Sequence, residues 1–191
     1  PLASVVERFG SMKSEKAVSE IALHSHGIPH VFPAAVEQQA EAAKPVETLG
    51  KRDDWRQIPL ITIDPPDAKD HDDAVFAEAD EDPQNEGGHI VYVAIADVAH
   101  YVTPGSPMDR EANLRGNSVY FPDRVVPMLP ERISNDLCSL REGENRPSIA
   151  VRMVIASDGR KTGHSFHRVT IRSTANLAYQ QAQAAIDGNP D

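Results

Sequence analysis

The chain has 191 residues, of which 40% are hydrophobic and 25% charged, which is enough to bury a core and excludes a wholly disordered protein. Its longest apolar stretch, Val91–Ala96, is far shorter than the roughly 20 residues that a membrane-spanning helix needs. Its one cysteine, Cys138, excludes an intrachain disulfide, and no secretory leader is evident. We therefore expect a soluble, cytoplasmic protein with no membrane partner. Because the chain begins at Pro1, we also expect it to be a piece of a longer protein.

The net charge of -10 is concentrated in one short window. Residues 58–89 hold ten acidic side chains and one basic one, whereas residues 90–191 hold eleven of each kind. A local excess of this kind is typical of a cation site rather than of a generally acidic surface. Ten of the eleven basic residues after position 89 are arginine, which suits phosphate contacts. Genome base composition explains the same bias, and both interpretations stay open.

The predicted elements begin with a short strand over residues 1–10 and continue with two short helices over 17–24 and 34–43, which form a linker. Three strands follow, and the third is almost continuously apolar, so we expect it near the centre of a sheet. The three strands cover residues 60–63, 74–77 and 89–98.

A capped helix is predicted next, with Ser106 at the N-cap, Pro107 at its first position and Gly116 as its stop. Residues 119–147 contain four prolines and predict an ordered loop rather than regular structure. The last elements are a hairpin and a helix, over residues 149–156, 164–172 and 177–186. Together these elements indicate an α+β fold with a mixed or antiparallel sheet, preceded by a helical linker.

Four aspartates flank one predicted turn. Asp64 ends an apolar strand, and Asp70, Asp72 and Asp73 begin the next, with Pro65 and Pro66 between them. A pair of like charges at ~4 Å costs ~4 kcal/mol at an effective dielectric constant near 20, so such a cluster must be exposed, protonated or filled with cations. A hard divalent cation such as Mg²⁺ is the simplest resolution.

The same window has two other interpretations. A solvated acidic loop is the plainer one, but these carboxylates directly adjoin apolar strands. A calcium loop of the EF-hand type that starts at Asp70 places Ala74 at the fifth position and Val75 where glycine is needed, so this register fails. Elsewhere in the chain, Cys138 has neither a base nor a cationic neighbour, and we expect a buried structural thiol.

The acidic motif is part of a longer series of segments in a recognisable order. This series resembles the catalytic domain of the ribonuclease II and ribonuclease R family. Its residues are more similar to those of ribonuclease R than to those of ribonuclease II. The segments that carry the resemblance are Thr62–Asp64, Asp67–Val75, Val93–Val102, Pro104–Ser106, Asp109–Ala112, Arg115–Gly116, Ser118–Pro122, Pro127–Pro130 and Ser134–Leu140.

The resemblance implies a processive 3′-to-5′ hydrolytic exoribonuclease that degrades single-stranded RNA to nucleoside 5′-monophosphates with Mg²⁺, for which Mn²⁺ can substitute. Asp64, Asp70 and Asp73 match the metal-binding acids of the family, and Asp72 matches the acid tied most closely to catalysis. Tyr120 matches an aromatic residue that packs near the 3′-terminal nucleotide of the substrate.

The resemblance also divides the chain. Residues 1–14 resemble the tail of an OB-type cold-shock domain, residues 15–50 the helical linker, and residues 51–191 the N-terminal part of the catalytic domain. The C-terminal half of that domain is expected to be missing, so we expect the chain alone to be inactive and any oligomer of it to be an artefact of truncation. The alternative is a non-catalytic RNA-binding or adaptor protein with a degenerate ribonuclease domain, although all four aspartates are intact.

Overall fold

The computed structural model describes Ser4 and residues 17–189. The strand predicted over residues 1–10, and the tail predicted over residues 1–14, therefore fall outside the described residues apart from Ser4. The chain divides into two compact units, each described by itself below. The first is made of Pro1–Ala42 and Thr103–Pro130, and the second of Ala43–Val102 and Glu131–Asp191.

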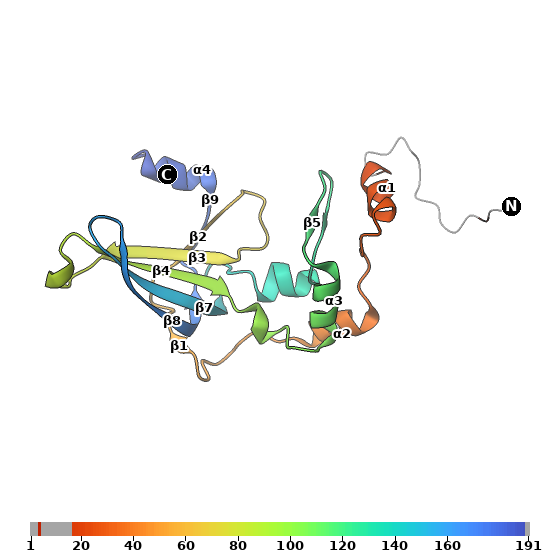
Figure 1. Cartoon of the computed structure of the whole chain (residues 1–191), viewed down its shortest axis with the longest axis horizontal. Coiled ribbons are helices and arrows are strands. Elements are labelled where there is room, and N and C mark those ends of the chain that lie inside the picture. The colour runs from red at the N-terminus through yellow and green to blue at the C-terminus, as the bar shows by residue number, and fades with distance from the viewer. Residues whose placement is uncertain (1–3, 5–16, 190–191) are drawn as a thin grey trace. The chain divides into compact units, whose positions relative to one another are not determined.

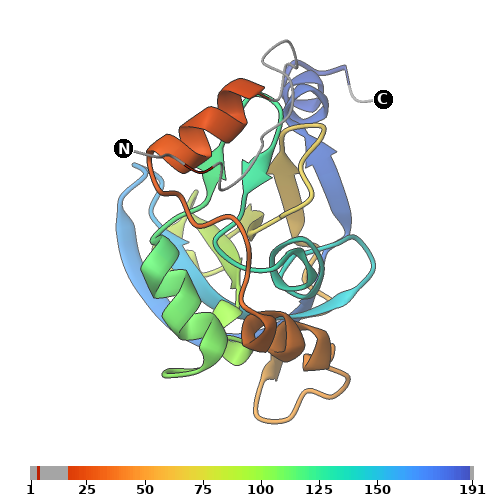
Figure 2. The same cartoon turned by 90° about the vertical axis from the view of Figure 1, so that its right-hand side faces the viewer.

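In its described residues, the first unit combines three helices with a two-stranded hairpin (Figures 1 and 2). Helix α2 packs against α3, where the backbone N–H of Met108 donates to Oε1 of Gln39 at 3.0 Å. Helix α1 is joined to the hairpin turn by an ion pair between Glu20 and Arg124. The elements of this unit are α1 (Ala17–Ser25), α2 (Ala34–Ala42), α3 (Pro107–Arg115), β5 (Val119–Tyr120) and β6 (Val125–Val126).

Helix α3 begins and ends where the sequence predicts. The hydroxyl of Ser106 accepts a hydrogen bond from the backbone N–H of Asp109 at 3.2 Å, so it satisfies one of the free donors of the first turn. Gly116 follows the last turn with φ of +78°, a backbone conformation that L side chains rarely adopt.

The second unit is built on one seven-stranded mixed sheet with the strand order β1-β8-β7-β4-β3-β2-β9. All neighbouring pairs are antiparallel except β1 with β8 and β2 with β9. Its strands are β1 (Asp53–Asp54), β2 (Ile61–Asp64), β3 (Asp73–Ala79), β4 (His89–Ala96), β7 (Asn145–Ile155), β8 (Lys161–Arg172) and β9 (Ala175–Ala178). Its helical elements are η1 (Pro83–Asn85), η2 (Val98–His100), η3 (Arg132–Leu137) and α4 (Tyr179–Ile186).

The α+β fold and the central place of β4 confirm the prediction, but two local predictions are wrong. The segment 119–147 is not free of regular structure, because it contains the β5–β6 hairpin and the six-residue π-helix η3. The final helix begins at Tyr179 rather than at Leu177. Leu177 belongs instead to β9, where it pairs with Ile63 of β2. Long-range pairing to a strand more than a hundred residues away overrides the local helical composition.

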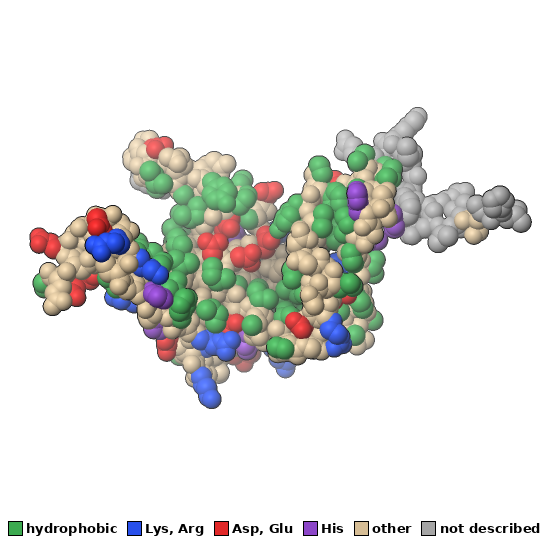
Figure 3. Space-filling view, viewed as in Figure 1, with side chains coloured by type: hydrophobic (Ala, Val, Ile, Leu, Met, Phe, Trp, Pro, Cys, Tyr) green, Lys and Arg blue, Asp and Glu red, His purple; other side chains and the backbone are tan. Residues whose placement is uncertain are grey.

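The two faces of the sheet differ in burial. Ala74, Ala94 and Ala150 lie opposite one another on β3, β4 and β7, and all three are buried. One position along, Asp73 lies opposite Ile95, which lies opposite Ile149. More than a third of the surface of each isoleucine is exposed. Asp73 therefore lies in a solvent-exposed row of otherwise apolar side chains across β3, β4 and β7. Figure 3 shows acidic side chains gathered among hydrophobic ones at this end of the sheet.

No helix among residues 17–189 is long and apolar enough to cross a membrane.

Candidate active site

The four aspartates of the predicted cluster lie at the facing ends of β2 and β3. Asp64 is the last residue of β2 and Asp73 the first of β3, while Asp70 and Asp72 lie in the connecting loop. Because β2 and β3 are antiparallel neighbours, the end of one strand meets the start of the next. Asp64 and Asp70 are half-buried, and Asp72 and Asp73 are exposed.

Asp72 is close enough to the other three carboxylates for their charges to act on it. The pKa of Asp72 is raised, first by partial loss of hydration and then by the negative charges of Asp70, Asp73 and Asp64, while His71 acts in the opposite direction. Asp72 is nevertheless exposed to solvent. The loop therefore concentrates negative potential around a carboxylate that solvent can reach.

The chemistry of this donor set fits a divalent cation. Carboxylate oxygens are hard ligands, and Mg²⁺ is usually held by one or two protein carboxylates together with water and phosphate oxygens. A cation would also relieve the repulsion that raises the pKa of Asp72. Within residues 17–189, no three His, Cys, Asp or Glu side chains converge closely enough to hold a metal ion by themselves.

A histidine inside the loop contacts one of the acids directly. Nδ1 of His71 lies 2.6 Å from Oδ2 of Asp64 and 3.3 Å from Oγ1 of Thr62. Thr62 is fully buried on β2, and its hydroxyl accepts a hydrogen bond from the amide of Asn176 on β9 at 2.7 Å. A chain of side-chain contacts thus joins Asp64 to the edge strand of the sheet.

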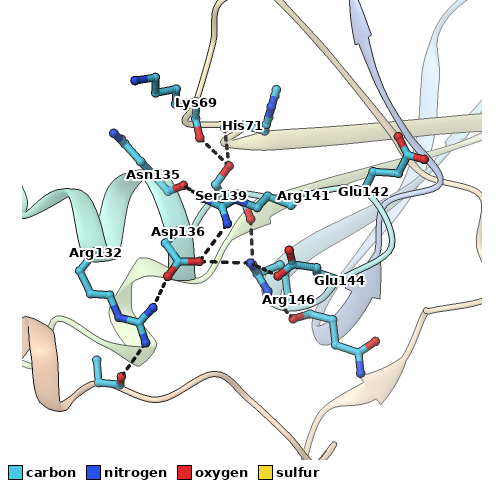
Figure 4. A network of polar contacts seen from close by, with 12 residues as sticks. Lys69, His71, Arg132, Asn135, Asp136, Ser139, Arg141, Glu142, Glu144 and Arg146 are labelled. Atoms are coloured by element: carbon cyan, nitrogen blue, oxygen red, sulfur yellow. Dashed lines mark hydrogen bonds and ion pairs between the residues drawn. The ribbon is translucent and has the colours of Figure 1, made fainter.

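The loop backbone is held by the segment that follows η3 (Figure 4). The N–H of His71 donates to Oγ of Ser139 at 3.1 Å, and Oγ of Ser139 donates to the carbonyl of Lys69 at 2.8 Å. The N–H of Leu140 donates to the carbonyl of His71 at 2.8 Å. These three hydrogen bonds connect residues about seventy positions apart in the chain and restrict the conformation of the acidic loop.

A buried arginine supports Ser139 in turn. Nε of Arg146 donates to the carbonyl of Ser139 at 2.8 Å, and its Nη2 lies 2.6 Å from Glu144 and 3.7 Å from Asp136 (Figure 4). Arg146 is only 4% exposed, so both ends of its guanidinium are committed to these partners. The reasoning from sequence did not identify Ser139, Arg146 or Asn176 as parts of the site, because nothing local marks which loop they contact.

Comparisons with known proteins identify the family of the chain. The model of the RNB domain family matches residues 52–191. The chain belongs to the RNB domain family. It is 43% identical to ribonuclease R of Escherichia coli over 193 aligned residues, which cover 100% of this chain and 23% of that protein. It is 44% identical to ribonuclease R of Acidithiobacillus ferrooxidans, with 43% of that protein covered.

Solved structures give the same family. Mycoplasma genitalium RNase R in complex with ribose-methylated single-stranded RNA matches with a TM-score of 0.84 and 30% identity over 92% of this chain and 27% of that chain. The yeast pseudonuclease Ssd1 shares the fold at a TM-score of 0.65 and 20% identity. This RNB chain covers 23% and 43% of the two ribonuclease R relatives, 27% of the Mycoplasma genitalium chain and 18% of the Ssd1 chain, which is less than half of each. The family predicted from the acidic motif is confirmed.

Two further predicted positions in this RNB chain have a defined place. Cys138 is 3% exposed, and burial, with the charges of Asp72 and Asp97, raises the pKa of its thiol to about 12, so it is the buried thiol that the sequence predicts. Tyr120 lies in the first unit on β5, with 69% of its surface exposed. An exposed aromatic ring of this kind is available for stacking on a base.

Proposed function

We propose that this chain is part of a processive 3′-to-5′ hydrolytic exoribonuclease that acts on single-stranded RNA in the cytoplasm and releases nucleoside 5′-monophosphates. The observation that carries the proposal is the set of four carboxylates at the junction of β2 and β3. Membership of the RNB domain family and the ribonuclease R relatives support it.

In this proposal Asp64, Asp70 and Asp73 hold Mg²⁺, or Mn²⁺ in its place. When bound there, the metal would supply activation of the attacking water and stabilisation of the leaving oxygen. Asp72, whose pKa is raised by partial loss of hydration and then by the charges of the other three aspartates, is proposed as the carboxylate nearest to the chemistry.

Tyr120 is proposed to stack on a base close to the 3′ end of the RNA. Stacking on an aromatic ring contributes about 1–3 kcal/mol per base and is indifferent to sequence, as a processive enzyme requires. We expect the activity to reside in the longer protein, since the chain spans only 23% of the Escherichia coli relative. The isolated chain is therefore expected to be inactive.

The test uses the full-length protein that contains this chain, with a 5′-labelled single-stranded RNA. When Mg²⁺ is present, we expect the labelled RNA to be degraded to short end-products without a ladder of intermediates. In EDTA we expect no turnover. Asp64→Asn and Asp72→Asn should each lower kcat by about 10²–10³-fold, the usual cost of removing one electrostatic stabiliser. Asp67→Asn is the matched control, since Asp67 is an exposed aspartate of the same loop that lies outside the proposed set.

Calorimetry with Mn²⁺ gives a second readout. Binding should weaken in Asp64→Asn and persist in Asp67→Asn. Equal effects of the two substitutions on both activity and binding would refute the assignment of the metal-holding residues. RNA binding without any hydrolysis by the full-length protein would instead favour the adaptor alternative.

A further inference from the structure

The geometry points to His71 as a positioning residue that orients the carboxylate of Asp64 for metal binding. This inference rests on the proposed function, because it assigns a role toward the metal that Asp64 is proposed to hold. His71 stands inside the acidic loop, and its side chain is the one that contacts a member of the cluster directly in the residues that the structure describes.

The contact is short and sheltered. Nδ1 of His71 lies 2.6 Å from Oδ2 of Asp64, and both side chains are about 15% exposed. An ionised carboxylate only accepts hydrogen bonds, so Nδ1 carries the proton and donates it to Oδ2. Oγ1 of Thr62 lies at 3.3 Å from the same Nδ1 and is a second acceptor. These two acceptors determine both the tautomer and the orientation of the imidazole ring.

Asp64 needs such a restraint. It is the last residue of β2, and Pro65 and Pro66 carry the chain away from the sheet immediately after it. The negative charges of Asp64 and Asp72 act on each other, so the two carboxylates repel. The hydrogen bond from His71 engages Oδ2, which leaves Oδ1 for a cation.

His71 can restrain Asp64 because its own position is determined from two sides. Its N–H donates to Ser139, and its carbonyl accepts from Leu140, so its backbone is attached to the segment after η3. Its ring contacts Thr62, which is buried and itself bonded to Asn176. Hydrogen-bonding partners of this kind hold a ligand carboxylate in one orientation and increase its affinity for the metal.

Substitutions that replace one ring nitrogen of His71 or the other test its positioning role in the full-length protein. The amide nitrogen of asparagine takes nearly the place of Nδ1, whereas that of glutamine takes nearly the place of Nε2. We expect His71→Asn to stay close to the wild type. His71→Gln and His71→Leu should weaken Mn²⁺ binding measured by calorimetry, and raise the Mg²⁺ concentration for half-maximal activity, by about 10-fold to 100-fold. The KM for RNA measured at saturating Mg²⁺ should not change.

His89→Gln is the matched control, because His89 is an exposed histidine at the start of β4. Melting temperatures are compared for all variants, and His71→Asn distinguishes lost positioning from a general folding defect. Unchanged Mn²⁺ affinity and Mg²⁺ requirement in both His71→Gln and His71→Leu would overturn the positioning role while leaving the proposed function intact. A wild-type protein without Mg²⁺-dependent hydrolysis, or an Asp64→Asn variant with full activity, would overturn both.

Discussion

Arg52→Met is expected to destabilise the second unit strongly, because it removes the main partner of a buried carboxylate. Asp97 follows β4 and is 2% exposed. Its Oδ2 lies 2.5 Å from Nη2 of Arg52 and 3.2 Å from Nε of Arg168. Arg52 also donates to the carbonyls of Ser148 and Val169, at 3.5 Å and 3.4 Å.

The expected magnitude follows from burial. Removing one partner of a buried ion pair costs about 3–5 kcal/mol, because the other charge stays in the interior without compensation. Arg168 remains close to Asp97 in the variant, but its side chain is 57% exposed, so water screens much of its attraction. The other carboxylate oxygen, Oδ1, has no hydrogen-bond partner among residues 17–189. Arg168 nevertheless still compensates part of the charge of Asp97, so we expect a loss near the lower end of this range, about 3 kcal/mol.

The assay is equilibrium unfolding of the 191-residue chain in urea at neutral pH, with the m-value checked for a two-state transition. In an Asp97→Asn background, Arg52→Met should cost only about 1 kcal/mol, since a neutral side chain leaves no unpaired charge. Arg56→Met is the matched control, because the Arg56–Asp54 pair has a similar 2.6 Å distance on the surface. Equal losses in the Arg52 and Arg56 variants would refute the argument from burial.

Two further predictions concern the candidate site. Asp72→Asn should raise the melting temperature in EDTA. The difference in melting temperature from the wild type should grow as the pH rises from 3.8, the ordinary pKa of aspartate, towards neutrality. The folded protein disfavours the charged form of Asp72, so its contribution to stability is lost as the pH rises through its raised pKa. Cys138, whose buried thiol has a pKa of about 12, should react with a thiol reagent at neutral pH only after denaturation.

Each of these two predictions has a direct control. Asp67→Asn changes an exposed aspartate of the same loop and should leave the pH dependence of stability unchanged. A melting temperature of Asp72→Asn that falls with rising pH relative to the wild type would contradict the sign. For the thiol, complete labelling of the native protein as fast as of the denatured one would contradict its burial.

The sequence alone was sufficient for elements whose signals are local. The apolar run before Asp64 and the Pro65–Pro66 pair predict where β2 ends, and the almost continuous apolar run of β4 predicts its central place. Ser106 and Gly116 predict the two ends of α3. In each case the signal is a residue type that acts on its own backbone or on a few neighbours, so no knowledge of the rest of the fold is needed.

Tertiary structure decided the elements and contacts that depend on distant partners. Leu177 has a helical neighbourhood but lies in β9, because β2 offers a free edge for parallel pairing. The sequence places His71 in the acidic motif, but its contact with Asp64 depends on the loop conformation that Ser139 holds from about seventy residues away. Sequence thus determined which residues carry the charge, whereas the fold determined which of them touch, because side-chain hydrogen bonds need positions set to within a few tenths of an ångström by the packing of the whole sheet.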